Sequence, residues 1–263
     1  MLVTSVLSLK GGVGKTSIVL GLASAAVRRN ISTLVVDLDP QSNATMALNP
    51  TTATATLAEL LADASPAHVG STIATSSWSE HLRLIPGSEA AERLNHPEPT
   101  ARSLGRLRSA LQRVRPVPEL VLIDCPPSLG QLTRSGLVAS HRALLVTEPG
   151  LFAVTGVQRA LEAVHDERQA HQPELQPLGV VINRARSRSS EQDYRIAELR
   201  QLFGPLVLSP TLPDRSAIQQ AQGAGVSIHD WPSSGGREVA TVFDRLLDRL
   251  LRSAKHSESS VAS

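Results

Sequence analysis

A short glycine-rich stretch near the start of the chain constrains its fold and its chemistry more than any other feature. It joins an apolar segment at 2–7 to a segment at 18–28 with helically spaced apolar residues, and it reads Lys10-Gly11-Gly12-Val13-Gly14-Lys15-Thr16-Ser17. Glycines let backbone N–H groups converge on anionic oxygens, and the start of a helix adds unpaired donors and a positive dipole end. Lys15 supplies a charge for outer phosphates, and the Thr16 hydroxyl is a ligand for Mg²⁺. A strand, this turn and a helix predict a nucleotide-phosphate site, which a merely flexible glycine turn would not explain.

The loop departs from the usual G-x-x-x-x-G-K-[ST] spacing at its first position, where Leu9 replaces glycine and Lys10 follows. The chain has only three lysines among its 26 basic residues, and two of them lie in this loop. Because an ammonium and a guanidinium are not interchangeable at a phosphate, both loop lysines are predicted to have specific roles. Lys10 cannot easily turn onto the phosphates that its own loop wraps, so we expect it to act on a neighbouring subunit.

Three aspartates lie where buried strands are expected to end. Asp37 and Asp39 follow an apolar run that begins at Ser32, and Asp124 follows another at 120–123. In a parallel α/β sheet, ligands bind outside the carboxyl ends of the strands, so we expect all three aspartates beside the phosphate loop. Asp124 is placed to hold a water of the Mg²⁺ shell. A helix cap or a solvated turn is the alternative for Asp37 and Asp39.

Length and composition are those of a globular α/β protein. The 263 residues are 41% hydrophobic and 19% charged, with a formal net charge of +2. The alternation of strands and helices favours a doubly wound, mostly parallel sheet flanked by helices, as a single domain over 1–252 with a disordered polar tail at 253–263. The one cysteine, Cys125, and the lack of a leader or a membrane-spanning run favour the cytoplasm. Strands are predicted at 2–7, 32–37, 81–85, 119–124, 142–146, 178–182 and 206–208, and helices at 18–28, 44–48, 56–62, 103–114, 155–169, 216–222 and 239–251.

Two later segments are candidates for holding the nucleoside. Asn183 ends the predicted strand at 178–182, and its amide can both donate to and accept from a base. A strand-end cap explains this residue equally well. Pro213 and Asp214 form a turn after the next predicted strand, where the proline ring is placed to wall an adenine.

Arginines are concentrated after Asn183. Positions 184–188 alternate arginine with small residues and contain no acid, which suits a phosphate backbone because such contacts need charge and no particular sequence. An ordinary solvated loop is the alternative. The arginine-rich helix predicted at 103–114 is likewise either a solvated face or a contact surface for an acidic partner. The predicted DNA contacts are Arg184, Arg186, Arg188, Arg195, Arg200 and Arg215.

Four stretches together resemble the ParA/Soj chromosome- and plasmid-partitioning ATPases, members of the deviant Walker A group that also contains MinD. They read KGGVGKTS, VDLDPQSNAT, LVLIDCPPSLG and LPDRSAIQQAQGAGVSI, and the resemblance extends over about residues 2–252. The first three are highly specific in combination. The resemblance implies a slow, partner-stimulated, Mg²⁺-dependent ATPase that forms an ATP-sandwiched homodimer.

The same resemblance implies roles for individual residues. Lys15 would contact the β- and γ-phosphates of ATP, and Asp39 would orient the attacking water. The metal site would contain Thr16 and Asp124, with Asp37 close to the metal.

Lys10 would be the signature lysine that reaches the partner's phosphates. A cross-subunit charge of this kind is worth roughly 10³–10⁵ in rate when it acts like an arginine finger. ATP-bound dimers of the family bind double-stranded DNA without sequence preference, and a ParB-type centromere-binding protein stimulates hydrolysis and releases them. The implied location is the cytoplasm, in association with the nucleoid.

Two positions depart from the family pattern without removing a catalytic group: Leu9, where relatives carry a glycine or a polar residue, and His141, where many carry an acid. The alternative function is a MinD-like membrane-cycling ATPase for placing cell division, because the chain ends in an amphipathic helix. Asp244 and Asp248 on its polar face oppose anionic lipid, so packing against the sheet is favoured and no membrane partner is expected. An iron–sulfur reductase of the same group would need two cysteine ligands per subunit, and this chain has one cysteine.

Overall fold

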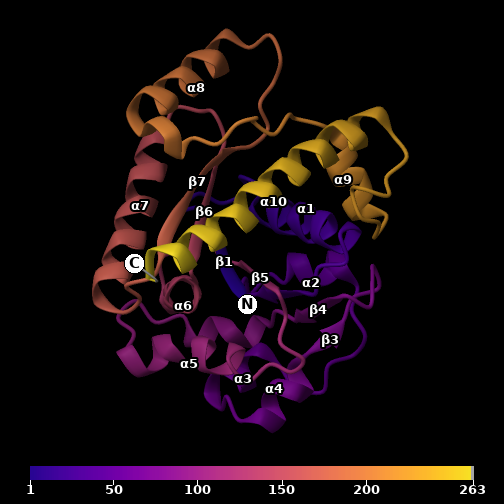
Figure 1. Ribbon diagram of the computed structural model, residues 1–263, viewed down its shortest axis with the longest axis vertical. Helices are drawn as coiled ribbons and strands as arrows, with labels where there is room; N and C mark the ends of the chain where they lie inside the picture. The colour runs from indigo at the N-terminus through magenta and orange to yellow at the C-terminus, as the bar shows by residue number, and fades with distance from the viewer. Residues whose placement is uncertain (262–263) are drawn as a thin grey trace.

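The computed structural model describes residues 1–261, with side chains described to residue 254. Its strands are β1 Leu2–Leu7, β2 Thr33–Asp37, β3 Ala74–Thr75, β4 Leu82–Ile85, β5 Leu120–Asp124, β6 Arg142–Thr147 and β7 Gln176–Ile182. They form one seven-stranded sheet in the order β3-β4-β2-β5-β1-β6-β7 (Figure 1). Every pairing is parallel except that of β3 with β4. The predicted doubly wound, mostly parallel α/β fold is confirmed.

Helices cover both faces of the sheet, because parallel neighbours are joined by helical crossovers. One face packs on α1, α2, α9 and α10, and the other on α3, α5, α6 and α7; Figure 1 shows α10 lying across α1. The α-helices are α1 Lys15–Arg28, α2 Asn43–Leu48, α3 Leu57–Ala62, α4 Pro66–Thr72, α5 Ala101–Leu111, α6 Gln131–Ala139, α7 Ala153–Ala170, α8 Ser190–Phe203, α9 Ser216–Gly223 and α10 Ser234–Val261; η1 Glu89–Leu94 and η2 Gly204–Leu206 are 3₁₀ turns.

The first strand lies inside the sheet, between β5 and β6. All six of its residues are buried, as expected for a parallel strand covered on both faces. Its register places Val6 opposite Asp124, and β5 in turn pairs Asp124 with Asp37 of β2. The ends of three neighbouring strands therefore bring the phosphate loop and two of the predicted aspartates to one edge of the sheet.

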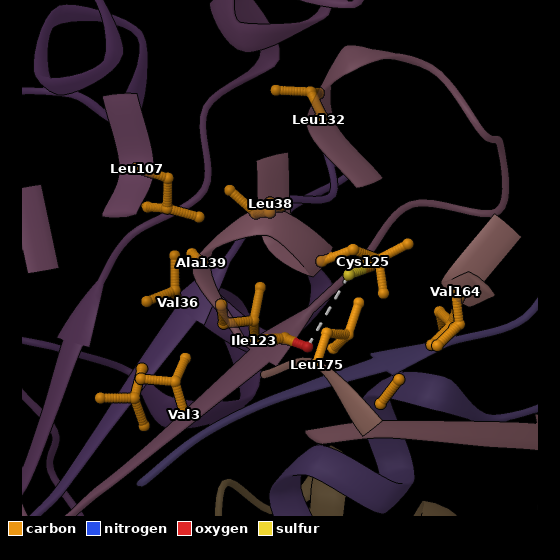
Figure 2. Packing of buried hydrophobic residues seen from close by; sticks show 14 of the residues in the cluster. Val3, Val36, Leu38, Leu107, Ile123, Cys125, Leu132, Ala139, Val164 and Leu175 are labelled. Atoms are coloured by element: carbon orange, nitrogen blue, oxygen red, sulfur yellow. Dashed lines mark hydrogen bonds between the residues drawn. The ribbon is translucent and has the colours of Figure 1, made fainter. Parts of the chain in front are cut away.

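Cys125 is packed among aliphatic side chains directly after β5. Figure 2 shows it beside Ile123 and Leu175, with its thiol near the Ile123 carbonyl at 4.0 Å. Burial and the adjacent Asp124 raise the pKa of the Cys125 thiol to about 12. A thiol that stays protonated is a poor nucleophile, so Cys125 serves here as a small core residue.

The last helix is fixed to the nucleotide-loop helix by a close contact between Gly21 of α1 and Phe243 of α10. A Cβ built on Gly21 would lie 2.2 Å from the Phe243 ring, so only glycine admits this approach. At the end of α1, Arg29 forms ion pairs with Asp244 at 3.5 Å and with Asp248. The apolar face of α10 is thus used within the protein, as predicted. Among the described residues, no helix is long and apolar enough to span a bilayer.

A buried histidine adds a polar link between the same two helices. His229, which precedes α10, lies with Nδ1 2.6 Å from the Ser24 hydroxyl of α1 and Nε2 3.4 Å from an Asp244 carboxylate oxygen. Burial lowers the pKa of His229, although the Asp244 charge opposes this effect. The neutral imidazole is therefore the form that this packing favours.

His141, the residue before β6, also has a structural role, at the end of the sheet where β1 and β6 begin. Its Nδ1 accepts a hydrogen bond of 3.0 Å from the Val3 N–H of β1. Burial lowers the pKa of His141, so the ring remains neutral and able to accept. The departure from the family's acid at this position is thus accommodated by a backbone contact.

The predicted strand at 206–208 is wrong. The chain there forms the 3₁₀ turn η2 and then a single bridge between Val180 and Val207. Gly204 has a positive φ of 51°, and Pro205 has no N–H to donate to a ladder, so an extended pairing cannot begin.

Three α-helices, α4, α6 and α8, were not predicted from the sequence. The last helix also differs, because α10 continues into the segment 253–263 where a disordered tail was predicted. Arg142 of β6 donates from Nε to the Ser253 hydroxyl, a long-range contact that periodicity does not reveal. The last two positions, 262–263, lie outside the described residues.

Candidate nucleotide site

The phosphate loop has the backbone shape that its glycines predict. Gly12 and Gly14 adopt φ values of 77° and 90°, in the left-handed region that favours glycine. The helix α1 begins at Lys15 directly after this turn, so its first N–H groups face the loop. A Cβ on Gly14 would lie 2.3 Å from the Asn183 amide nitrogen, so glycine is also required there by space. The Lys15 side chain lies along the loop with only 6% of the residue exposed.

A cavity of about 520 Å³ opens over this loop. It is large enough for a nucleotide, and its walls come from the phosphate loop, the segment after β2, helix α2, the turn after β5, and the end of α9. Its lining residues are Gly11, Gly12, Gly14, Lys15, Thr16, Leu20, Asp39, Gln41, Asn43, Met46, Ala47, Pro127, Arg184, Gln222 and Gly223.

The predicted metal residues Thr16 and Asp124 lie together beneath the loop. The Thr16 hydroxyl donates to Oδ2 of Asp124 at 2.7 Å, while the buried Oδ1 has no hydrogen-bond partner among the described residues. Burial and the nearby Asp37 charge raise the pKa of Asp124 to about 8, against the Thr16 hydrogen bond and the Lys15 charge. An unsatisfied carboxylate oxygen beside a hydroxyl fits a divalent cation.

The donor set fits Mg²⁺ bound together with a nucleotide. Within the part of the chain that the structure describes, no three His, Cys, Asp or Glu side chains gather to hold a metal alone. Mg²⁺ typically keeps several waters and takes one or two carboxylates plus substrate phosphates, so a site with Thr16 and Asp124 needs no further protein ligand.

Asp37, predicted to lie near the metal, is committed to protein contacts. Its Oδ2 accepts from the Thr45 backbone N–H at 2.8 Å and from the Thr45 hydroxyl at 2.7 Å, and its Oδ1 accepts from the Asp39 N–H at 3.2 Å. The Thr45 hydroxyl oxygen also accepts from the Gly87 N–H at 2.8 Å. Burial raises the pKa of Asp37 to about 6 despite these bonds. Asp37 thus joins β2, α2 and the loop after β4, and its charge acts on Asp124 through space.

The remaining catalytic candidates face in different directions. Asp39 lines the cavity, and its carboxylate accepts from the Gln41 N–H at 3.0 Å. The side chain of Lys10 is 63% exposed, and its Nζ lies 3.9 Å from Glu148. Lys10 lines a second, smaller hollow with Glu148 and Phe152. This outward direction agrees with the expectation that Lys10 acts beyond its own subunit.

The three nucleoside candidates are less available than predicted. Asn183 is 2% exposed, its amide nitrogen donates to the Val13 carbonyl at 2.7 Å, and its oxygen accepts from the Arg184 N–H. Asp214 forms an ion pair with Arg186 at 2.8 Å, and Pro213 bridges to Ala185. In the described arrangement, Asn183 holds the phosphate loop against the end of β7, so its alternative as a strand-end cap is the one that its contacts match.

The predicted DNA-contact arginines divide into two groups. Four are paired with acids: Arg184 with Glu148, Arg186 with Asp214, Arg195 with Glu191 and Glu198, and Arg215 with Glu238. Within the described part of the chain, Arg188 and Arg200 make no ion pair. Arg184 also lines the nucleotide cavity, so its position links it to the phosphate loop rather than to an open surface.

Three residues of this region were not singled out from the sequence. Gln222 of α9 lines the cavity and donates to the Ser17 hydroxyl at 3.1 Å. Thr45 holds the predicted Asp37, and Glu148 contacts the predicted Lys10 and Arg184. Gln222 and Thr45 lie in stretches that the family resemblance covers, but for Glu148 no local spacing indicates the role, because its partners are distant in sequence.

Known proteins resemble this chain over most of its length. A family model described as an AAA domain matches residues 1–177. The sporulation initiation inhibitor protein Soj of Bacillus subtilis is 30% identical over 237 residues, which cover 88% of this chain and 91% of Soj. The chromosome partitioning protein ParA of Caulobacter vibrioides is 27% identical over 254 residues, covering 94% of each.

One of the similar solved structures contains a bound nucleotide. The cobyrinic acid a,c-diamide synthase of Mycobacterium smegmatis, with bound ADP and magnesium, matches with a TM-score of 0.79 at 26% identity. The match covers 97% of this chain and 96% of that protein. The fold thus recurs in a protein that holds ADP and magnesium.

Proposed function

The chain belongs to the AAA-domain family that includes the ParA- and MinD-type ATPases, and on this basis we propose that it is a DNA-partitioning ATPase. In this proposal two copies bind ATP and Mg²⁺ and form a homodimer with the nucleotides between them. The dimer binds double-stranded DNA without sequence preference. A ParB-type partner stimulates hydrolysis to ADP and phosphate, and the dimer then leaves the DNA.

One observation carries the nucleotide part of the proposal: the Thr16–Asp124 pair, with an unsatisfied buried oxygen, lies directly beneath a glycine loop and Lys15. ATP supplies the transferable phosphoryl group, and Mg²⁺ supplies charge neutralisation when bound. Lys15 holds the outer phosphates, Thr16 and Asp124 hold the metal, and Asp39 orients the attacking water. Each lies at the edge of the sheet where ligands of α/β proteins bind.

The dimer part of the proposal rests on Lys10. An ammonium on a side chain that is 63% exposed and does not line the nucleotide cavity is available to a second molecule. A positive charge delivered across an interface acts where the transition state gathers negative charge. The name of the Caulobacter relative, a chromosome partitioning protein, supports the partitioning role.

For DNA, the arginines without an acid partner are the strongest candidates. Arg188 lies just before α8 and Arg200 lies in its last turn, and both residues are exposed. A dimer would double this set. Non-specific affinity should be about 10⁻⁴–10⁻⁶ M at physiological salt.

The experiment that tests the proposal is a hydrolysis assay with and without plasmid DNA and a ParB-type centromere-binding protein. We expect slow basal hydrolysis that rises when both are added, and loss of the rise in Lys10→Ala. Normal stimulated hydrolysis by Lys10→Ala would contradict the cross-subunit role. Co-sedimentation with anionic vesicles in the presence of ATP would instead favour the MinD-like alternative, against which the packing of α10 on α1 argues.

A further inference from the structure

Glu148, the first residue after β6, contacts both Lys10 and Arg184. The sequence predicts a cross-subunit role for Lys10 and a DNA contact for Arg184. Its Oε1 accepts from Arg184 Nη1 at 2.6 Å, and its Oε2 lies 3.9 Å from Lys10 Nζ. The same Arg184 nitrogen donates to the Gly12 carbonyl at 2.8 Å. One carboxylate therefore joins the outward lysine, the glycine turn and the end of β7.

We propose that Glu148 is a positioning residue for Lys10: it retains the lysine within its own subunit, and Arg184 limits how strongly it does so. The inference rests on the proposed ATP-sandwiched dimer and concerns the step at which Lys10 is delivered. In that step Lys10 exchanges the carboxylate of Glu148 for the triphosphate of a second copy of the chain.

The geometry supports a contact that is easily exchanged. The side chain of Lys10 is 63% exposed and stands at the outer limit of an ion pair, whereas that of Arg184 is 40% exposed and lies at hydrogen-bond distance. Arg184 is also held in place, because its Nη1 has a second acceptor in the Gly12 carbonyl of the phosphate loop. The carboxylate charge is thus shared mainly with the fixed arginine, and only the remainder acts on the mobile lysine.

The proposal predicts that neutralising Glu148 and neutralising Arg184 shift the dimerisation equilibrium in opposite directions. Removing the charge of Glu148 frees Lys10 and should favour the ATP-bound dimer. Removing the charge of Arg184 leaves Glu148 with Lys10 as its only cation, and should disfavour the dimer. A merely structural role at the phosphate loop predicts that both substitutions weaken nucleotide binding and the dimer together.

The test measures the protein concentration at half-dimerisation by sedimentation at saturating Mg²⁺ and a non-hydrolysable ATP analogue. We expect Glu148→Gln to lower that concentration and Arg184→Gln to raise it, each by about 2- to 5-fold, the range of a partly exposed ion pair. Both shifts should shrink in 0.5 M salt, where such charges are screened. Glu191→Gln is the matched control, because Glu191 pairs with Arg195 on α8, away from the loop.

Lys10 supplies the decisive cross-check. In a Lys10→Ala background, Glu148→Gln should change the half-dimerisation concentration by less than it does with the lysine present, as a double-mutant cycle requires for a coupled pair. Shifts of the same sign in Glu148→Gln and Arg184→Gln, no shift in Glu148→Gln, or an equal shift without Lys10 would each overturn the inference. Failure of the unsubstituted protein to dimerise with the analogue would instead contradict the proposed function itself.

Discussion

The carboxyl edge of the sheet and the arginine-rich segment at 184–215 are both marked by charged residues in the sequence, yet they differ in how much that sequence determines. At the sheet edge, residues from three strands meet as spacing predicts, with Thr16 and Asp124 in direct contact. In the arginine segment, some of the acids that pair with the arginines are distant in sequence: Glu148 holds Arg184, and Glu238 holds Arg215, whereas Arg195 is held by Glu191 and Glu198 nearby. The end of a buried strand predicts where a residue lies in the fold, whereas a run of like charges does not predict which of its side chains remain unpaired.

The largest effect should come from the sheet edge. Lys15→Ala removes the buried charge that holds the outer phosphates, and we expect hydrolysis to fall by about 10²–10³-fold, the cost of losing one preorganised electrostatic contact. Steady-state phosphate release, measured without DNA, checks this. Arg200→Ala is the matched cation control and should retain the basal rate. Equal losses in both variants would remove the distinction between the two regions.

A second substitution tests whether the position of α1, which begins at the phosphate loop, depends on its contact with α10. Gly21→Ala places a methyl group against the Phe243 ring, so α1 or α10 must shift, and the free energy of unfolding should fall by about 1–3 kcal/mol. Urea unfolding followed by circular dichroism measures the change. Gly105→Ala in α5, where a Cβ would have no neighbour within 4 Å, is the control and should be neutral or slightly stabilising. Equal stability of both variants would show that α1 is positioned by the sheet alone.

The arginine segment can be tested by comparing paired with unpaired cations. We expect Arg188→Ala with Arg200→Ala to weaken DNA binding and to reduce the slope of log K against log salt by about one unit for each lost phosphate contact. Arg186→Ala with Arg215→Ala should have a smaller effect, because each of these arginines is already neutralised by an acid. Filter binding with a non-hydrolysable ATP analogue at three salt concentrations separates the two outcomes. A larger effect of the acid-paired set would mean that DNA displaces those acids.

The smallest expected effect concerns pH. The pKa of His229 is lowered by burial in the folded protein, so between that lowered value and the ordinary value of about 6.5 the unfolded chain binds more protons. The contribution of His229 to stability should therefore fall as pH drops below about 6.5 and level off below the folded pKa, whereas the raised pKa values of Asp37 and Asp124 act in the opposite direction. His229→Asn should remove this contribution, so that the stability of the variant falls less, or rises more, as pH drops. Urea unfolding of both proteins at pH 7.5 and 5.5 is the measurement, and an unchanged pH dependence would show that His229 makes no such contribution.

Much of the fold could be predicted because buried parallel strands read as short apolar runs. The phosphate loop, β2 and β5 were placed correctly, and with them the meeting of Lys15, Thr16 and Asp124. The helix α8 was not predicted, because its sequence has no strong apolar stripe and only Leu199 is fully buried. The hydrogen bond from the Asn183 amide to the Val13 carbonyl could not be predicted either. The two residues are far apart in the sequence, so no local pattern indicates the contact.

The position of β1 has a consequence for how the protein is made. This strand is synthesised first but pairs with β5 and β6, whose residues end at Asp124 and Thr147. At about 5–20 residues per second, its second neighbour is translated on the order of 10 s after the strand itself. Until β5 has been translated, β1 has two unpaired edges and Thr16 has no Asp124 to contact. Nucleotide and Mg²⁺ therefore cannot assist the folding of the nascent chain before Asp124 has been made, and chaperones that cover apolar strands would act before the ligand does.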